Sequence, residues 1–355
     1  MKGIPGEIVR TKLSELEVFA RGKEITIRKT AIEAGQRDVI EQAQFYQHAP
    51  PEVARHYPTL LGHNISKPPY WYEMPFYFYP SLRDVVHFRS DVPLNLLEDR
   101  ITAILTFLFS KRYRLKSGGG GCAYFGEAFT SRLSKRLEQL EQSDSIIAQA
   151  LSTKAIELQG NSLPHPSVAF QRIVSNVEML HRLYAPRLVS IHGQLEFDHI
   201  LVNTHPEPDV DFVLLDCQDR LGDPAYDLGK LWESLHSLVD FIKTDFFDLS
   251  YSIENDVLAV GRFVMPVERV SVSNRLYELA RSCLTNISAE TSDPHLLMRS
   301  DFAEAVHLAT AGPFFYNGTE AGRKRALAFY VASAQAFHRF LRTWGPEQIE
   351  GHTTA

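Results

Sequence analysis

One stretch of the sequence, residues 190–232, concentrates side chains that can bind metals or accept protons. His192 lies before a short apolar run, and Asp216 lies at the end of a second one. Glu196, Asp198 and His199 lie between His192 and the first apolar run. Carboxylates and imidazoles are common proton acceptors and metal ligands, and a proton acceptor must lie within hydrogen-bonding reach of its substrate. The sequence therefore points to a polar loop and a carboxylate that serve one site.

The elements that must position these residues are visible in the same stretch. Two apolar strands, residues 200–202 and 212–215, flank a polar hairpin and bring the loop and Asp216 to the same place. A helix follows, with Asp223 as its N-cap, a proline at its first position and Asp227 in its first turn. Both carboxylates stabilise a helix N-terminus through its dipole, so we expect structural roles for Asp223 and Asp227.

These residues resemble the aminoglycoside phosphotransferase and choline kinase-like family, whose loop reads H-G-D-x-x-x-x-N-I-L, followed by an apolar strand ending in I-D and then by G-D-P-x-x-D-L-A. This chain reads HGQLEFDHIL, then VLLD, then GDPAYDLG. The positions in register are His192, Gly193, Ile200, Leu201, Asp216, Gly222, Asp223, Pro224, Asp227 and Leu228. The resemblance covers residues 20–345 and is specific over 190–235. It implies an α+β, bilobal, protein-kinase-like fold with a small β-rich N-terminal lobe and a large helical C-terminal lobe.

The resemblance also implies roles for three positions. In the family, the D of H-G-D takes the proton of the acceptor hydroxyl, the N binds metal, and the D of I-D is the main metal ligand. Asp216 keeps the last role, but Gln194 replaces the base and His199 replaces the amide ligand. An amide cannot take a proton at neutral pH, and imidazole suits Mn or Zn better than Mg. We therefore expect a metal site of Asp216 and His199 beside an altered catalytic loop that includes His192 and Gln194.

Two carboxylates of the loop, Glu196 and Asp198, are candidates for a substitute base because either can reach the site from the loop. Asp198 and Asn203 also repeat the spacing of the family's base and amide ligand four residues later. Such a shift is disfavoured, because slipping residues 200–202 would turn their apolar side chains toward water.

The N-terminal part supplies the expected nucleotide site. Lys29, in the run ITIRKTA, lies where the family's strand lysine contacts the α and β phosphates, and Glu41 in the following helix is its expected ion-pair partner. The alternative is a solvated lysine and a surface glutamate. No glycine-rich loop precedes Lys29, since the turn that should cover the phosphates falls at Leu13, Ser14 and Glu15. This turn departs from the family's pattern.

An aromatic run, YWYEMPFYFYPSL, resembles the hinge between the lobes. Glu73, Met74 and Phe76 lie in it, and backbone groups near Met74 would hydrogen-bond an adenine. The alternative is an aromatic-rich core strand, which we expect over residues 70–79 in either case.

Periodicity predicts the order of the other elements. We expect strands within residues 7–31 and a helix over 36–48, then helices over 131–158 and 168–184. The strand-loop-strand unit at 188–217 would be the one β insertion in a helical remainder.

The length of 355 residues and the 44% of hydrophobic residues suffice for two lobes with a sizeable core. We expect residues 1–80 to form the nucleotide-binding lobe, with a hinge near 73–80. Residues 81–355 would form the helical lobe that carries the catalytic loop and the acceptor pocket.

Charge and cysteine content narrow the functional classes. The net charge is −6 and no run of five basic residues occurs, so neither nucleic acid nor an anionic membrane surface is an expected partner. The three cysteines are widely spaced without a CxxC pair, which argues against disulfides or a zinc site and suits a cytoplasmic protein. No apolar run approaches the roughly 20 residues that cross a bilayer, and no signal segment is recognisable, so no membrane insertion is expected.

The favoured interpretation is a phosphotransferase that uses ATP and a divalent metal, Mg or Mn, to phosphorylate a hydroxylated small molecule such as a sugar or a polysaccharide precursor. One alternative is a pseudokinase that binds a nucleotide or acts as a scaffold. Another is an adenylyl transferase on the same fold. The acceptor and the oligomeric state are not encoded in any motif.

Overall fold

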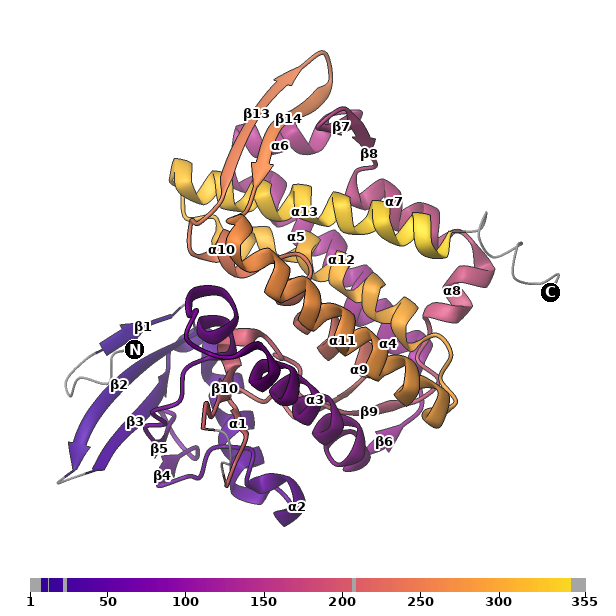
Figure 1. Cartoon of the computed structure of the whole chain (residues 1–355). Coiled ribbons are helices and arrows are strands. Elements are labelled where there is room, and N and C mark those ends of the chain that lie inside the picture. Colours follow the sequence, from indigo (N-terminus) through magenta and orange to yellow (C-terminus); the bar gives the residue numbers. More distant parts are fainter. Residues whose placement is uncertain (1–7, 12, 22–23, 206–208, 346–355) are drawn as a thin grey trace. The chain divides into compact units, whose positions relative to one another are not determined.

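The computed structural model describes residues 8–11, 13–21, 24–205 and 209–345 (Figure 1). The chain divides into two compact units, each made of two separate segments. Unit 1 holds the chain up to Lys116 together with Ser190–Leu221, and unit 2 holds Ser117–Val189 and the chain from Gly222 onward. The loop with the candidate catalytic residues therefore groups with the N-terminal sheet, whereas the expected domains placed it with residues 81–355.

Unit 1 contains a five-stranded antiparallel sheet in the order β1-β2-β3-β5-β4 (Figure 1). Its strands are β1 (Ile8–Arg10), β2 (Ser14–Arg21), β3 (Glu24–Ala31), β4 (Gly62–Asn64) and β5 (Trp71–Pro75). The first three confirm the strands expected within residues 7–31, although Glu7, Lys12, Gly22 and Lys23 lie outside the described residues. Strand β5 ends at Pro75, short of the expected residue 79. Proline is tolerated at the end of a strand because it has no N–H with which to continue the ladder of hydrogen bonds.

Helix α1 (Gln36–His48) has the predicted bounds and packs against β3 and β5. Val39, Ala43 and Tyr46 share one helical face and are buried. The helix ends before Pro50, which cannot continue it, and α2 (Pro51–Ala54) and α3 (Leu94–Ser110) follow.

Strand β9 (Leu188–Ile191) leads the chain back into unit 1, and β12 (Arg220–Gly222) leads it out. Between them, β10 (Ile200–Val202) and β11 (Phe212–Leu214) form an antiparallel hairpin in which Ile200 is paired with Leu214. The strand-loop-strand unit predicted for residues 188–217 is thus confirmed.

Unit 2 is mainly helical, and α9 (Pro224–Leu235) and α13 (Glu320–Trp344) both pack against α12 (Leu296–Phe315). Its fully buried aromatic side chains include Trp232, Phe302 and Phe337. None of the helices in the described ranges is long and apolar enough to cross a bilayer. The helices are α4 (Gly121–Phe125), α5 (Arg132–Ser143), α6 (Ser145–Ser152), α7 (Pro166–Val174), α8 (Val177–Leu183), α9 (Pro224–Leu235), α10 (Val239–Lys243), α11 (Val267–Thr291), α12 (Leu296–Phe315) and α13 (Glu320–Trp344).

A second β insertion in unit 2 corrects the sequence expectation. Residues predicted to be helical form β7 (Ala155–Leu158), β13 (Asp248–Glu254) and β14 (Val257–Val264). With β8 (Asn161–Leu163) they make a sheet in the order β13-β14-β7-β8, of which β13 and β14 form a projecting hairpin (Figure 1). Its parallel β7–β14 pairing joins residues about a hundred positions apart, which local periodicity cannot register. A short strand, β6 (Ser117–Gly118), pairs with Leu188 and Val189.

Candidate active site

The β10–β11 hairpin brings His199 and Asp216 together. The two residues lie just outside its paired ends, and the N–H of Leu215 donates to the carbonyl of His199 at 2.7 Å. His199 Nε2 is consequently 3.6 Å from Asp216 Oδ2, close together as a shared metal site requires. Asp216 itself has φ of 59°, a left-handed conformation that is strained for this residue type and is often found at functional sites.

Lys29 of β3 completes this cluster. Its Nζ is 2.7 Å from Asp216 Oδ1 and 3.1 Å from Gln42 Oε1, and the residue is buried. The Tyr72 hydroxyl also donates to Gln42 Oε1, at 3.0 Å. The expected Lys29–Glu41 ion pair is wrong, because Glu41 instead accepts from Arg37 one turn earlier on α1. Gln42, one residue later, is on the buried side of the helix and occupies the predicted place.

The charge of Asp216 is stabilised by its neighbours. Burial alone would raise the pKa of its carboxyl, but Lys29 and then His199 outweigh burial and lower this pKa to about 2. Burial acts in the same direction on nearby Asp38, where it raises the pKa despite the Lys29 charge. Asp216 is therefore an anion at neutral pH, as a metal ligand must be.

His199 is oriented by the backbone of the candidate catalytic loop. Its Nδ1 is 2.8 Å from the carbonyl oxygen of Gln194, and a carbonyl can only accept, so Nδ1 carries the proton. In the neutral imidazole the lone pair is then on Nε2, the nitrogen that faces Asp216. The same carbonyl also accepts from the N–H of Glu196 at 2.8 Å.

His192 is fully buried and contacts the loop from within the core of unit 1. Its Nδ1 accepts from the N–H of Gln194 at 3.2 Å, and its ring stacks on Tyr57. Burial, followed by the charges of His199 and Arg112, lowers the pKa of His192 far below its ordinary value. The imidazole stays neutral and holds the loop in place.

Gly193 is required where the loop turns. Its φ is 84°, and a Cβ there would lie 2.9 Å from Gln218 Oε1. This close approach lets the loop pass over the segment that follows Asp216.

The two candidate substitute bases are both partly exposed. Asp198 forms an ion pair with Arg83 at 2.7 Å, which stabilises its charged form. Glu196 is partly exposed and lies just before the turn Phe197–His199. Asn203 accepts from the N–H of His205 in the hairpin turn, and residues 200–202 pair with residues 212–214 in the register that their apolar side chains predict.

Sequence reasoning missed the brace beneath the loop, which is centred on Arg112. This fully buried guanidinium donates to the Ile191 carbonyl and to Asp219 Oδ1, both at 2.8 Å. Asp219 also accepts from Ser190 and from Lys116. No local signal marks Arg112, because its partners lie 79 and 107 residues away.

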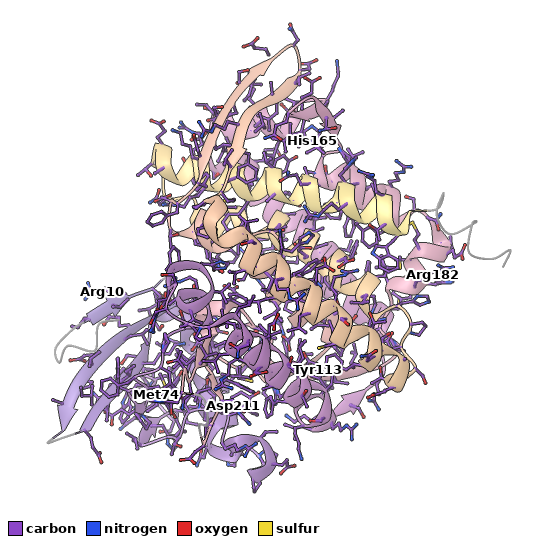
Figure 2. All side chains as sticks on the ribbon, in the orientation of Figure 1. Arg10, Met74, Tyr113, His165, Arg182 and Asp211 are labelled. Carbon is purple, nitrogen blue, oxygen red and sulfur yellow. The ribbon has the colours of Figure 1, made fainter. Side chains whose placement is uncertain are left out.

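The three residues expected at the hinge lie at the end of β5, which Figure 2 marks by Met74. Glu73 is buried and accepts two hydrogen bonds from Arg28, at 2.9 and 2.6 Å. The Glu73 carbonyl accepts from Leu61, and the Phe76 N–H donates to the Ile25 carbonyl. These two backbone groups are therefore already used within the sheet.

The turn between β1 and β2 uses its own N–H groups. The Thr11 hydroxyl accepts from the N–H of Leu13 at 3.2 Å and from that of Ser14 at 2.9 Å. Glu15, which would repel a phosphate, pairs with Arg10 at 2.7 Å. The turn rests on Gly35, where a Cβ would lie 1.9 Å from the Leu13 carbonyl oxygen.

Asp223 and Asp227 begin α9 in unit 2. Asp223 accepts from the N–H of Ala225 at 3.0 Å, as the N-cap prediction requires, and pairs with buried Arg299 at 2.7 Å. Asp227 is fully buried within the first turn.

Comparisons with known proteins agree with this architecture. Neither a protein-family model nor a curated protein sequence matches the chain. Among solved structures, a putative aminoglycoside phosphotransferase from Ralstonia eutropha is 11% identical, with a TM-score of 0.51 over 95% of this chain and 92% of that chain. A thermostable mutant of the aminoglycoside phosphotransferase APH(4)-Ia, in ternary complex with AMP-PNP and hygromycin B, is 9% identical, with a TM-score of 0.50 over 96% of this chain and 94% of that chain. The chain thus has the kinase-like fold of the aminoglycoside phosphotransferases, as the resemblance over residues 190–235 predicted.

Proposed function

We propose that the chain is a kinase-like phosphotransferase that moves the γ-phosphoryl group of ATP to a hydroxyl group of a small molecule, such as a sugar or a polysaccharide precursor. The observation that carries the proposal is the cluster of Lys29, Asp216 and His199, in which Lys29 and Asp216 are 2.7 Å apart. Phosphoryl transfer depends on a cation for the phosphates and a carboxylate for the metal, and this cluster holds both. The similar fold of APH(4)-Ia, which was solved with AMP-PNP, supports ATP as the donor.

The residues present fit a metal that is bound mainly by a nucleotide. No group of three or more His, Cys, Asp or Glu side chains that could hold an ion occurs within the described ranges. Mg is commonly held by one or two carboxylates plus substrate phosphates, so Asp216 would suffice as its protein anchor. When bound, such an ion neutralises charge on the phosphates. His199 Nε2 faces Asp216, and an imidazole ligand there would favour Mn over Mg.

The chain's own residues would then bind and orient the reactants. Lys29 would exchange part of its contact with Asp216 for a phosphate oxygen, and Met74 would pack against the adenine. Gln194 would orient the acceptor hydroxyl without taking its proton, because an amide is only a hydrogen-bond partner. Glu196 and Asp198 are the candidate bases, because either carboxylate can reach the site from the loop.

A nucleotide-binding pseudokinase is the second candidate. Two observations favour it: Gln194 replaces the family's catalytic carboxylate, and the N–H groups of the turn, which would otherwise be available to phosphate oxygens, donate to Thr11. Loss of a general base typically costs only about 10² to 10⁴-fold in rate, so it does not alone exclude catalysis.

The test combines thermal stability and ATP turnover, each with Mg and with Mn. We expect ATP with metal to raise the melting temperature of the wild type, and Asp216→Asn to abolish that rise. Gln194→Asp should increase turnover by roughly tenfold, about 1.4 kcal/mol of barrier, because it restores a proton acceptor. Gln44→Asp makes the same chemical change at an exposed position of α1 and should leave turnover unchanged.

The outcomes separate the candidates. Binding of ATP without turnover in any variant would favour the pseudokinase. If the wild type and all variants neither bind ATP nor turn it over, both candidates are refuted.

A further inference from the structure

Two arginines of α5, Arg132 and Arg136, are one helical turn apart and each faces an aromatic ring. The i, i+4 spacing places them on the same face of the helix. The guanidinium carbon of Arg132 is 5.6 Å from the ring centroid of Tyr226, and that of Arg136 is 4.3 Å from the ring centroid of Phe314. Both arginines are partly buried, and all four residues belong to unit 2.

Neither guanidinium has a carboxylate partner among the residues that the structure describes. Arg132 donates to the Tyr226 hydroxyl, and Arg136 donates to the amide oxygen of Gln139 at 2.7 Å. Elsewhere in the same unit, Arg299 and Arg323 are each neutralised by an aspartate. An adjacent pair of uncompensated cations is notable in a chain of net charge −6.

The two positive charges oppose each other. Burial, and then the charge of Arg132, lowers the pKa of Arg136, and Tyr226 acts in the opposite direction. Like charges one turn apart on a helix are destabilising, whereas an oxyanion between two guanidinium groups forms charge-assisted hydrogen bonds with both.

The aromatic partner of Arg132 is packed in the core of unit 2, whereas Phe314, the partner of Arg136, is 42% exposed. A π-helical turn, Gly126–Ser131, directly precedes α5, and such turns are frequent at functional sites. Tyr226 is buried, and its carbonyl accepts from His307 Nε2 at 3.0 Å. The ring of His307 meets that of Tyr226 edge-on, with centroids 4.4 Å apart. His307 therefore contacts both the backbone carbonyl and the ring of Tyr226.

We propose that Arg132 and Arg136, flanked by Tyr226 and Phe314, bind the oxyanion of a small organic molecule, either a carboxylate or a phosphate. The guanidinium group is planar and presents paired donors, so it recognises both oxyanions through two parallel hydrogen bonds. The site is separate from the Lys29–Asp216 cluster and uses none of its residues. Binding there does not depend on the proposed phosphotransfer, and it is measured without ATP.

Calorimetry on the full chain tests the site with glucuronate, glucose 6-phosphate and inorganic phosphate as probes and glucose as the neutral control. We expect at least one anion to bind and glucose not to bind. Glucuronate and the phosphates distinguish the two sources of the oxyanion. Arg136→Gln should weaken the binding by roughly tenfold or more, because it removes a charge-assisted pair of hydrogen bonds. Arg136→Lys should lose part of that affinity, since it keeps the charge but not the planar pair of donors.

The matched control is Lys135→Gln, which removes the same charge from an exposed position of α5. It should change the dissociation constant by less than about twofold, as expected for an exposed charge. Equal weakening in Lys135→Gln and Arg136→Gln would overturn the proposal, because it would indicate only a general effect of net charge. Absence of binding for all three anions, or binding unaffected by Arg136→Gln, would also overturn it.

Discussion

Replacing Lys29 by methionine removes the cation that stabilises Asp216. Methionine preserves the apolar stem of the side chain, so the main change is electrostatic. In the variant, burial acts on the carboxyl with only His199 and His192 left to oppose it, and the pKa of Asp216 should rise. The ion pair is expected to be a stabilising element of unit 1 as well as part of the candidate site.

The pKa of Asp216 sets the magnitude. It is about 2 in the folded protein against an ordinary value of 3.8. At about 1.4 kcal/mol per pKa unit, this difference corresponds to roughly 2.5 kcal/mol of folding free energy at neutral pH. The Asp216 side chain is 29% exposed, so solvent screening reduces the expected loss in Lys29→Met to about 1 to 2 kcal/mol.

The sign of the pH dependence follows from the lowered pKa. A carboxyl with a lowered folded-state pKa contributes its full stabilisation above its unfolded-state value, and loses it as the pH falls through the folded-state value. The contribution of Asp216 is therefore complete at pH 7, declines below about pH 4 and is mostly lost near pH 2. The stability difference between wild type and Lys29→Met should shrink by roughly half at pH 3.

Urea unfolding monitored by circular dichroism at pH 7 and pH 3 measures both quantities. Arg37→Met, which breaks the exposed Arg37–Glu41 pair of α1, is the matched control and should match the wild type at both values. The double variant Lys29→Met/Asp216→Asn should recover much of the loss, since it leaves no uncompensated buried charge. A Lys29→Met protein as stable as the wild type at pH 7, or a deficit that is unchanged at pH 3, would refute this reasoning.

Three further predictions concern packing and capping. Gly35→Ala should cost roughly 1 to 3 kcal/mol of unfolding free energy, because its Cβ would lie 1.9 Å from the Leu13 carbonyl oxygen. Gly119→Ala, with open space around its Cβ, is the control, and equal urea midpoints for the two variants would contradict the prediction. Thr11→Val should cost about 1 kcal/mol in the same assay, because it removes the acceptor for two turn N–H groups; an unchanged midpoint would show that water replaces it. Asp223→Ala should cost at least about 2 kcal/mol, because it removes the N-cap of α9 and leaves buried Arg299 with Asp293 alone. Asp223→Asn keeps a capping oxygen and should lose less, so equal losses would assign the whole effect to the ion pair.

Local patterns predicted those parts of the fold that local forces determine. The bounds of α1 followed from its amphipathic spacing and the prolines behind it, and the start of α9 followed from Asp223 and the proline at its first helical position. The β10–β11 hairpin was predictable because two apolar runs flank a polar one.

The errors occurred where tertiary contacts decide. Glu41 and Gln42 are neighbours in sequence, and only the rotation of α1 relative to β3 selects Gln42 for Lys29. The β7–β14 pairing and the Arg112 brace both join distant segments, so no local signal marks either.

The discontinuous course of the chain has a consequence for synthesis on the ribosome. Asp216 is synthesised 187 residues after Lys29, and only then can it neutralise the charge of Lys29 within unit 1. At about 5 to 20 residues per second, that interval lasts roughly 10 to 40 s. During this time the rest of the first segment of unit 1 and the whole first segment of unit 2, Ser117–Val189, are synthesised before the loop that contains Asp216. The nascent N-terminal sheet is therefore exposed to chaperones for much of translation, and folding of unit 1 is completed late, only after the loop that contains Asp216 emerges.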